Sequence, residues 1–231
     1  GVKMKKLLAF FSVILMAGSL YAKEVTLLMD WFPQGNQSGY WQAQFDNQYH
    51  DDVKITIKSG GPKINTTAAV ASGQAEFGLQ ASDSVMLANA KGAGLKGIFV
   101  SLNHVPYTLV FHPNTGVNSV KDLDGRPFAV KMGVTYWKWV KHTYQLNAVK
   151  EFPLTGDLGL FARTPQQFQQ GYSLFLPARL AAKGVASEQI TVESLGYRPY
   201  SVLFTTDKLI KENPELVQTV VDRLSISFPK S

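Results

Sequence analysis

Two aromatic residues, Trp31 and Phe32, lie at a position where they could bind a flat small molecule. They directly follow a predicted strand at residues 25–29, within the segment Asp30-Trp31-Phe32-Pro33. A sheet of parallel strands opens to a ligand cleft beyond the carboxyl ends of its strands. A Trp there can stack on a planar ligand and donate one N–H. We therefore expect Trp31 to contact a ligand and Phe32 to pack in the core.

Two further segments of the first half could meet the same ligand. Gly60-Gly61-Pro62 ends the second predicted strand, where glycines allow close backbone approach and the next helix offers free N–H groups. A plain turn explains the same residues equally well. Ser82 and Asp83 open a later helix, where they could hydrogen-bond a ligand or cap the helix. Both alternatives stay open.

The second half carries a matching group between a strand and a helix, at Gly133, Thr135, Tyr136 and Trp137. Their position predicts that they face the cleft from a second lobe. Aromatic side chains from both lobes would then enclose a flat molecule.

Patterns that would indicate an enzyme are weak or missing. Gly92 to Gly97 fits the letters G-x-G-x-x-G, but it follows a helix and precedes a strand, the reverse of the dinucleotide-binding order. His50-Asp51-Asp52 has no second ligand cluster at a recognisable spacing. The sequence contains no Cys, which excludes disulfides, thiolate metal sites and Cys nucleophiles. We predict no catalytic residue, no metal site and no cofactor.

The elements that position these residues alternate between strands and helices. The first series has strands at 25–29, 53–57, 76–79 and 95–102, with helices at 38–48, 66–72 and 83–90. The second has strands at 107–111, 128–130 and 190–192, with helices at 136–144, 168–171 and 176–183. A strand at 201–205 and a helix that opens at 213–215 follow. This order predicts an α/β fold of two lobes, each a mostly parallel sheet flanked by helices. We expect lobe 1 at residues 23–106, lobe 2 at 107–199 and a return to lobe 1 at 200–231.

The N-terminal segment has the pattern of an export signal. Lys5-Lys6 precede an apolar run from Leu7 to Leu15, and small residues lead to Ala22. The run is too short to span a bilayer, which takes about 20 apolar residues. We predict a signal peptide at residues 4–22, cleaved after Ala22. The net charge is +6, but the Lys and Arg residues do not form a continuous run, so we expect no nucleic-acid partner.

Several of these segments together resemble one protein family. The matching segments are Asp30-Trp31-Phe32-Pro33, Gly39-Tyr40, Gly60-Gly61-Pro62, residues 70–78 (VASGQAEFG), residues 122–125 (DLDG) and residues 205–210 (TTDKLI). They are similar to the NMT1/THI5-like and sulfonate/taurine group of solute-binding proteins. The similarity covers about Val25 to Arg223.

The resemblance implies a hinged two-lobe binding protein of the periplasmic type. Such a protein is a monomer that delivers a small molecule to the permease and ATPase of an ABC importer. The implied ligand is an aromatic heterocycle, such as a pyrimidine precursor of thiamine, or a sulfonate. Two alternatives remain, a pyrimidine-synthesis enzyme of the THI5 kind and a sensory ligand-binding domain. The enzymes of the family use a Cys-rich iron site, which a chain without Cys does not offer.

The chain departs from the family at three places. Gln37 stands where many thiamine-precursor binders carry a His, although we still count it and Tyr40 as candidate ligand contacts. Leu176 stands where relatives commonly have a Glu before a Pro. Both departures argue against a strict aminopyrimidine match. Relatives also extend past the point that matches Arg223, and the last eight residues here do not resemble that continuation. We therefore expect a C-terminally truncated chain with an incomplete first lobe.

Overall fold

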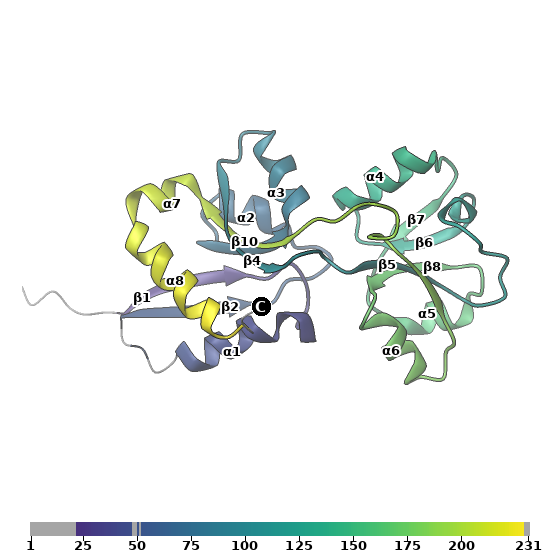
Figure 1. Cartoon of the computed structure of the whole chain (residues 1–231), viewed down its shortest axis with the longest axis horizontal. Helices are drawn as coiled ribbons and strands as arrows, with labels where there is room; N and C mark the ends of the chain where they lie inside the picture. Colours follow the sequence, from purple (N-terminus) through teal and green to yellow (C-terminus); the bar gives the residue numbers. More distant parts are fainter. Residues whose placement is uncertain (1–21, 48–49, 51, 229–231) are drawn as a thin grey trace, which may run out of the picture.

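The computed structural model describes residues 22–47, 50 and 52–228. The predicted signal peptide at residues 4–22 lies outside this range except for Ala22. Figure 1 shows two bodies, which we call lobe 1 and lobe 2, joined by two extended segments. Each lobe is built on a sheet of five strands.

Lobe 1 contains the first and the last strands of the chain. Its sheet has the order β2-β1-β3-β10-β4, from β1 (Lys23–Leu28), β2 (Val53–Lys58), β3 (Phe77–Ala81), β4 (Leu95–Leu102) and β10 (Ser201–Thr206). The helices of this lobe are α1 (Ser38–Asn47), α2 (Thr66–Ala71), α3 (Ser82–Asn89), α7 (Asp207–Glu212) and α8 (Pro214–Ile226), and the short 3-10 turn η1 (Gly35–Gln37) precedes α1.

Lobe 2 contains the middle of the chain. Its sheet has the order β7-β6-β8-β5-β9, from β5 (Tyr107–Phe111), β6 (Pro127–Val130), β7 (Lys150–Pro153), β8 (Phe168–Tyr172) and β9 (Glu188–Thr191). The helices here are α4 (Thr135–Tyr144), α5 (Leu158–Arg163) and α6 (Leu176–Ala181), with a 3-10 turn η2 (Val120–Leu123).

Each sheet has one reversed strand among parallel neighbours. In lobe 1, β10 pairs antiparallel with both β3 and β4, while β1 pairs parallel with β2 and β3. In lobe 2, β5 pairs antiparallel with β8 and β9, while β6 pairs parallel with β7 and β8. The two reversed strands each follow a crossing from the other lobe. The predicted α/β fold of two mostly parallel sheets is confirmed, and the reversed strands are an addition to it.

The strands form where the sequence alternates or stays apolar. Val53, Ile55 and Ile57 of β2 point into the core of lobe 1, and the polar residues between them face outward. Strand β5 is buried at all five positions, as expected for a strand inside a covered sheet.

One element is not what the sequence indicates. Residues 168–171 were expected to form a short helix, but they belong to strand β8. The segment Phe-Gln-Gln-Gly-Tyr lies between β6 and β5, and its first three residues are buried. Two hydrogen-bonded neighbours outweigh the helix propensity of its glutamines.

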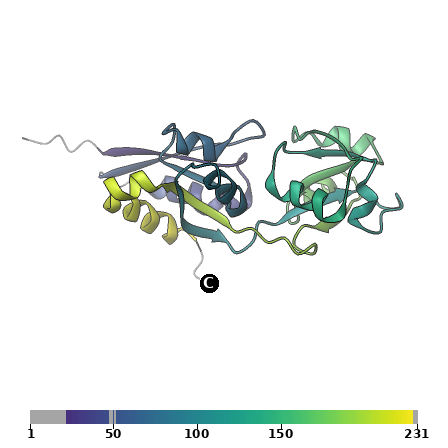
Figure 2. The same ribbon diagram turned by 90° about the horizontal axis from the view of Figure 1, so that it is seen from above.

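The two segments that cross between the lobes lie side by side. Val105 N donates to Pro199 O at 2.7 Å, which joins the outgoing segment to the returning one. Tyr200 N donates to Ser82 Oγ at 3.0 Å, which fixes the returning segment to the start of α3. Figure 2 shows the lobes on either side of this double connection. Within the described residues, no helix is both long and apolar enough to cross a membrane.

Candidate functional site

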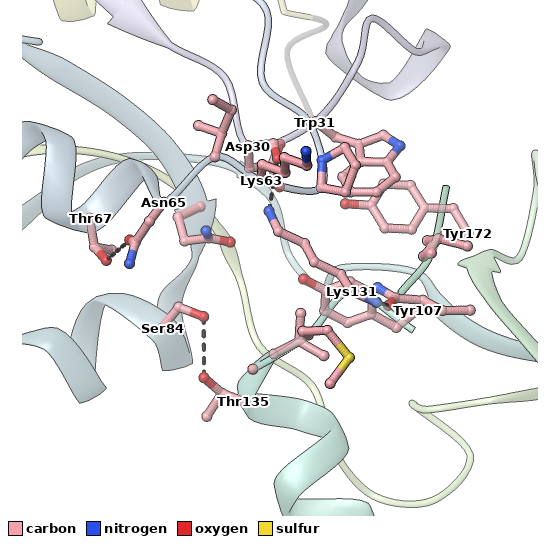
Figure 3. A pocket seen from close by; sticks show the side chains of 18 of the residues that line it. Asp30, Trp31, Lys63, Asn65, Thr67, Ser84, Tyr107, Lys131, Thr135 and Tyr172 are labelled. Carbon is pink, nitrogen blue, oxygen red and sulfur yellow. Dashed lines mark hydrogen bonds between the residues drawn. The ribbon is translucent and has the colours of Figure 1, made fainter. Parts of the chain in front are cut away.

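A cavity of about 560 Å³ lies between the two lobes. Lobe 1 lines it with residues that include Trp31, Pro62 and Ser84, and lobe 2 contributes Lys131 and Thr135 among others. Figure 3 shows side chains from both lobes converging on this space. Its size is within the range of small-molecule sites, about 300–1,000 Å³.

Trp31 and Lys131 meet in this cavity from opposite lobes. Trp31 follows β1, and Lys131 follows β6, so each stands just past the carboxyl end of a strand. The Lys131 Nζ lies 5.4 Å from the centre of the Trp31 ring and donates to the Asp30 backbone O at 3.1 Å (Figure 3). The Lys131 backbone N donates to Gln170 Oε1 at 2.7 Å, which fixes the start of the side chain. An ammonium over an aromatic face is attracted by the ring quadrupole.

Asp30 supplies a buried carboxyl group at the wall of the cavity. Only 9% of the residue is exposed, and Oδ1 accepts a hydrogen bond from Gln37 Nε2 at 3.1 Å. Burial raises the pKa of Asp30 from 3.8 to about 6, although the Lys131 charge and the hydrogen bonds act in the opposite direction. Burial also lowers the pKa of Lys131, and the Asp30 carboxylate partly offsets that effect.

Two tyrosines of lobe 2 line the cavity from the central strands. Tyr107 of β5 and Tyr172 of β8 lie edge to face with ring centres 5.6 Å apart. Burial holds both pKa values well above the ordinary value of 10.0, so both phenols are neutral. Neutral phenols can donate a hydrogen bond and offer an apolar face.

Direct contacts join the lobes around the cavity. Ser84 Oγ, in the first turn of α3, lies 3.2 Å from Thr135 Oγ1 at the start of α4. Phe175 of lobe 2 packs against Gly35 of lobe 1, where an added Cβ would lie 2.9 Å from the ring. The lobes therefore touch both through a pair of hydroxyl groups and through an aromatic ring on a glycine.

Four of the residues expected to bind a ligand do line the cavity. They are Trp31, Pro62, Gly133 and Thr135. Gly133 has φ +81°, a left-handed conformation that glycine adopts without strain, and it turns the chain from β6 into α4. Ligand contact by these four residues stays a prediction.

Three of the expected contacts have other roles beneath the wall of lobe 1. Gln37 is buried against Asp30, outside the lining. Tyr40 is fully buried, and its ring centre lies 4.8 Å from that of Phe228. Gly60 packs so close to the neighbouring loop that an added Cβ would lie 2.1 Å from Met29 O. Close packing of backbone, rather than ligand approach, requires glycine there.

Five other residues that were expected to contact a ligand also lie outside the lining of the cavity. Gly61 faces the Phe32 ring, and Ser82 Oγ accepts from Tyr200 N. Asp83 Oδ2 accepts from Tyr197 OH at 2.7 Å, and burial raises the Asp83 pKa. Tyr136 and Trp137 were expected to face the cleft but are buried in the core of lobe 2.

The reason for the wrong placement of Tyr136 and Trp137 lies in helix α4. Tyr136, Trp137 and Val140 share the face that packs on the sheet, and Tyr136 stacks on Tyr107 at 4.4 Å. The cleft meets only the turn before the helix and its polar face. Phe32 was expected in the core, yet 46% of it is exposed because its ring lies over Gly61 at the surface.

The sequence reasoning missed Lys131, Asp30, Tyr107 and Tyr172. A signal existed for Lys131, because it follows β6 as Trp31 follows β1, at the edge of a sheet where ligands bind. Tyr107 and Tyr172 gave no such signal, since Tyr107 is one of several apolar residues in a predicted strand and Tyr172 directly follows a segment that was expected to be a helix.

The lining of the cavity is strongly positive. Five of its residues are cationic and one is acidic, namely Lys63, Lys91, Lys131, Lys138 and Arg179 against Asp30. In the part of the chain that the structure describes, no three His, Asp or Glu side chains cluster so that they could hold a metal ion. The cavity therefore offers aromatic faces, neutral donors and positive charge.

The arrangement of two lobes, two crossings and an interlobe cavity is the fold of periplasmic binding proteins. The alkanesulfonate-binding protein SsuA from Xanthomonas axonopodis pv. citri, solved with MOPS bound, superposes with a TM-score of 0.68 at 17% identity, over 88% of this chain and 72% of that one. The periplasmic aliphatic sulphonate binding protein SsuA from Escherichia coli gives 0.65 at 15% identity, over 90% and 68%. These similarities show the fold.

The sequence places the chain within a family of this fold. The profile of the family described as NMT1/THI5 like matches residues 36–151, half of the chain, and the protein belongs to that family. A 4-amino-5-hydroxymethyl-2-methylpyrimidine phosphate synthase from Legionella pneumophila is 30% identical over 112 residues. That alignment covers 48% of this chain and 35% of the synthase, so the chain matches about a third of that relative's length.

Proposed function

We propose that this chain is the solute-binding component of an ABC importer and captures a small organic molecule between its lobes. The observation that carries the proposal is the interlobe cavity, whose lining comes from both lobes. A ligand that contacts both walls stabilises the closed arrangement by its differential affinity for it. The outgoing and returning crossings, joined by the Val105–Pro199 hydrogen bond, are a suitable hinge.

The lining favours a flat ligand. Trp31 offers an indole face, and Tyr107 and Tyr172 offer phenols beside it. An aromatic heterocycle or a small sulfonate would use these groups. The protein would act as a monomer in the periplasm, after cleavage of the signal peptide at residues 4–22. Its partners would be the permease and the ATPase of the importer.

A titration tests this proposal. The mature chain is mixed with thiamine pyrimidine precursors, flavin, taurine and alkyl sulfonates while Trp fluorescence and melting temperature are followed. Binding predicts a saturable change in fluorescence together with a rise in melting temperature, because a ligand that binds only the folded state stabilises it. A folded sample that responds to none of these compounds contradicts the proposal.

A second candidate function comes from the Legionella relative. The name of that relative describes the synthesis of a pyrimidine phosphate, and the alignment with it covers 48% of this chain. If this chain shared that activity, it would bind iron and turn over once to release a pyrimidine phosphate. Metal analysis and product detection by mass spectrometry after incubation with iron test the alternative. If neither bound iron nor product is detected, the enzyme alternative is ruled out and solute binding remains as the function.

A further inference from the structure

The Lys131 ammonium group lines the cavity without forming an ion pair to any residue that the structure describes. Its Nζ contacts the Asp30 backbone O and the Trp31 ring. Among the residues that the structure describes, no acidic oxygen lies within the 4.0 Å of an ion pair with Lys131. An ammonium has three N–H donors. Within the described residues, one of these donors is used in the hydrogen bond to Asp30 O, and the other two have no protein acceptor.

Asp30, the acidic residue of the lining, makes no ion pair with Lys131 and offsets its charge only in part. Its Oδ1 is engaged by Gln37 Nε2 rather than by Lys131. The desolvation of Lys131 outweighs the attraction of that carboxylate, because the pKa of Lys131 is lowered on balance. The lining contains four further positive charges, those of Lys63, Lys91, Lys138 and Arg179. Those four side chains are exposed to solvent, whereas Lys131 is half-buried. A charge that is partly removed from water is normally paired, and Lys131 has no ion-pair partner among the described residues.

We propose that Lys131 binds an anionic group of the ligand, and that the ligand is a small aromatic acid. This inference rests on the proposed function and specifies the chemical class of the solute. The aromatic ring would stack on Trp31 and the acidic group would accept the free N–H donors of Lys131. Because Nζ lies 5.4 Å from the Trp31 ring centre, an acidic group attached directly to a ring stacked beside Lys131 on Trp31 would be within reach of the ammonium group. A carboxylate and a sulfonate satisfy this geometry equally.

The experiment compares matched acids and amides by isothermal titration calorimetry. The probes are nicotinate, pyridine-3-sulfonate and the uncharged nicotinamide. We expect wild-type protein to bind at least one acid ten-fold or more tightly than the amide, because hydrogen bonds to a charged group are about twice as strong as neutral ones. The protein variants are Lys131→Met, Lys131→Arg and the control Lys183→Met, which removes an exposed charge of lobe 2 outside the cavity.

Lys131→Met is expected to reduce the preference for the acid to less than two-fold, because the substitution weakens binding of the acid far more than binding of nicotinamide. Lys131→Arg and Lys183→Met are expected to keep the preference. Saturable binding of nicotinamide by Lys131→Met also shows that this variant folds. The inference is overturned if Lys131→Met keeps the preference, or if wild type binds acid and amide equally. It is also overturned if none of the three probes binds while another compound of the wider panel does. If neither these probes nor that panel bind, the proposed function itself fails.

Discussion

Ser84 Oγ and Thr135 Oγ1 lie 3.2 Å apart, although one residue is in the first turn of α3 and the other in the first turn of α4. This hydrogen bond joins lobe 1 to lobe 2 at the edge of the cavity. It is a direct contact between the lobes that involves only side chains of the protein.

Loss of this bridge is expected to open the ligand-free protein. A single hydrogen bond contributes about 0.5–1.5 kcal/mol net, so Thr135→Val shifts the open–closed equilibrium by about 2- to 13-fold. Small-angle scattering should show a larger radius of gyration for ligand-free Thr135→Val than for wild type. Ser84→Ala should give the same change, and the double variant should add little. An unchanged radius in both single variants contradicts a latching role.

Trp31 is expected to supply most of the stacking energy. Burial of an aromatic side chain against a ligand is worth roughly 1.5–3 kcal/mol, so Trp31→Ala should weaken binding of any planar ligand by about ten-fold or more. The fluorescence response should disappear in Trp31→Phe but persist in Trp139→Phe, since Trp139 packs on Tyr197 away from the cavity. Equal loss of signal in both Phe variants would show that the ligand lies elsewhere.

The buried carboxyl of Asp30 makes the free energy of unfolding depend on pH. Burial raises its pKa from 3.8 to about 6, so between these values the folded state binds more protons than the unfolded state. Stability is therefore lost as pH rises through this window, and the cost of ionised Asp30 above it is about 3 kcal/mol.

Asp30→Asn is expected to remove this penalty while keeping an oxygen for Gln37. Urea unfolding at pH 4.0, 5.0 and 7.0 measures the difference between variant and wild type. The variant should gain stability relative to wild type as the pH rises, and the gain should level off above the Asp30 pKa. A difference that is constant with pH, or that falls as pH rises, refutes this explanation.

Gly60 and Gly61 should respond very differently to the same substitution. A Cβ at Gly60 would lie 2.1 Å from Met29 O, a backbone atom, whereas at Gly61 it would lie 3.3 Å from the movable ring of Phe32. Gly60→Ala is expected to cost about 1–3 kcal/mol or more of the free energy of unfolding, as overpacking does. Gly61→Ala should cost less than about 1 kcal/mol. Equal midpoints of urea unfolding would contradict the close packing at Gly60.

The sequence predicts the lobes and the strand ends better than the side chains that face the cavity. Trp31 could be placed there because it follows a strand at an open sheet edge. Tyr136 and Trp137 follow a strand too, but helix α4 turns their face toward the sheet. Which face of a helix is covered depends on packing with other elements, and a local pattern cannot show it.

The two reversed strands explain a second structural feature that the sequence did not predict. The position of β8 between β6 and the reversed β5 is a long-range pairing, and residues 168–171 alone favour a helix. Lys131 was missed for a related reason. Its significance comes from the contact with Asp30 of the other lobe, about 100 residues earlier in the chain.

The central claim is that a small molecule is held between the lobes, and the distance between the lobes tests it most directly. Because the chain has no Cys, Asn147→Cys and Gln218→Cys introduce two unique labelling sites, both exposed, on lobe 2 and on α8 of lobe 1. Single-molecule energy transfer between them should shift to a shorter, narrower distance distribution when a compound that binds is added. In Trp31→Ala the same shift should require a concentration of the compound about ten-fold or more higher. A compound that binds wild type with an unchanged distance distribution would contradict capture between the lobes.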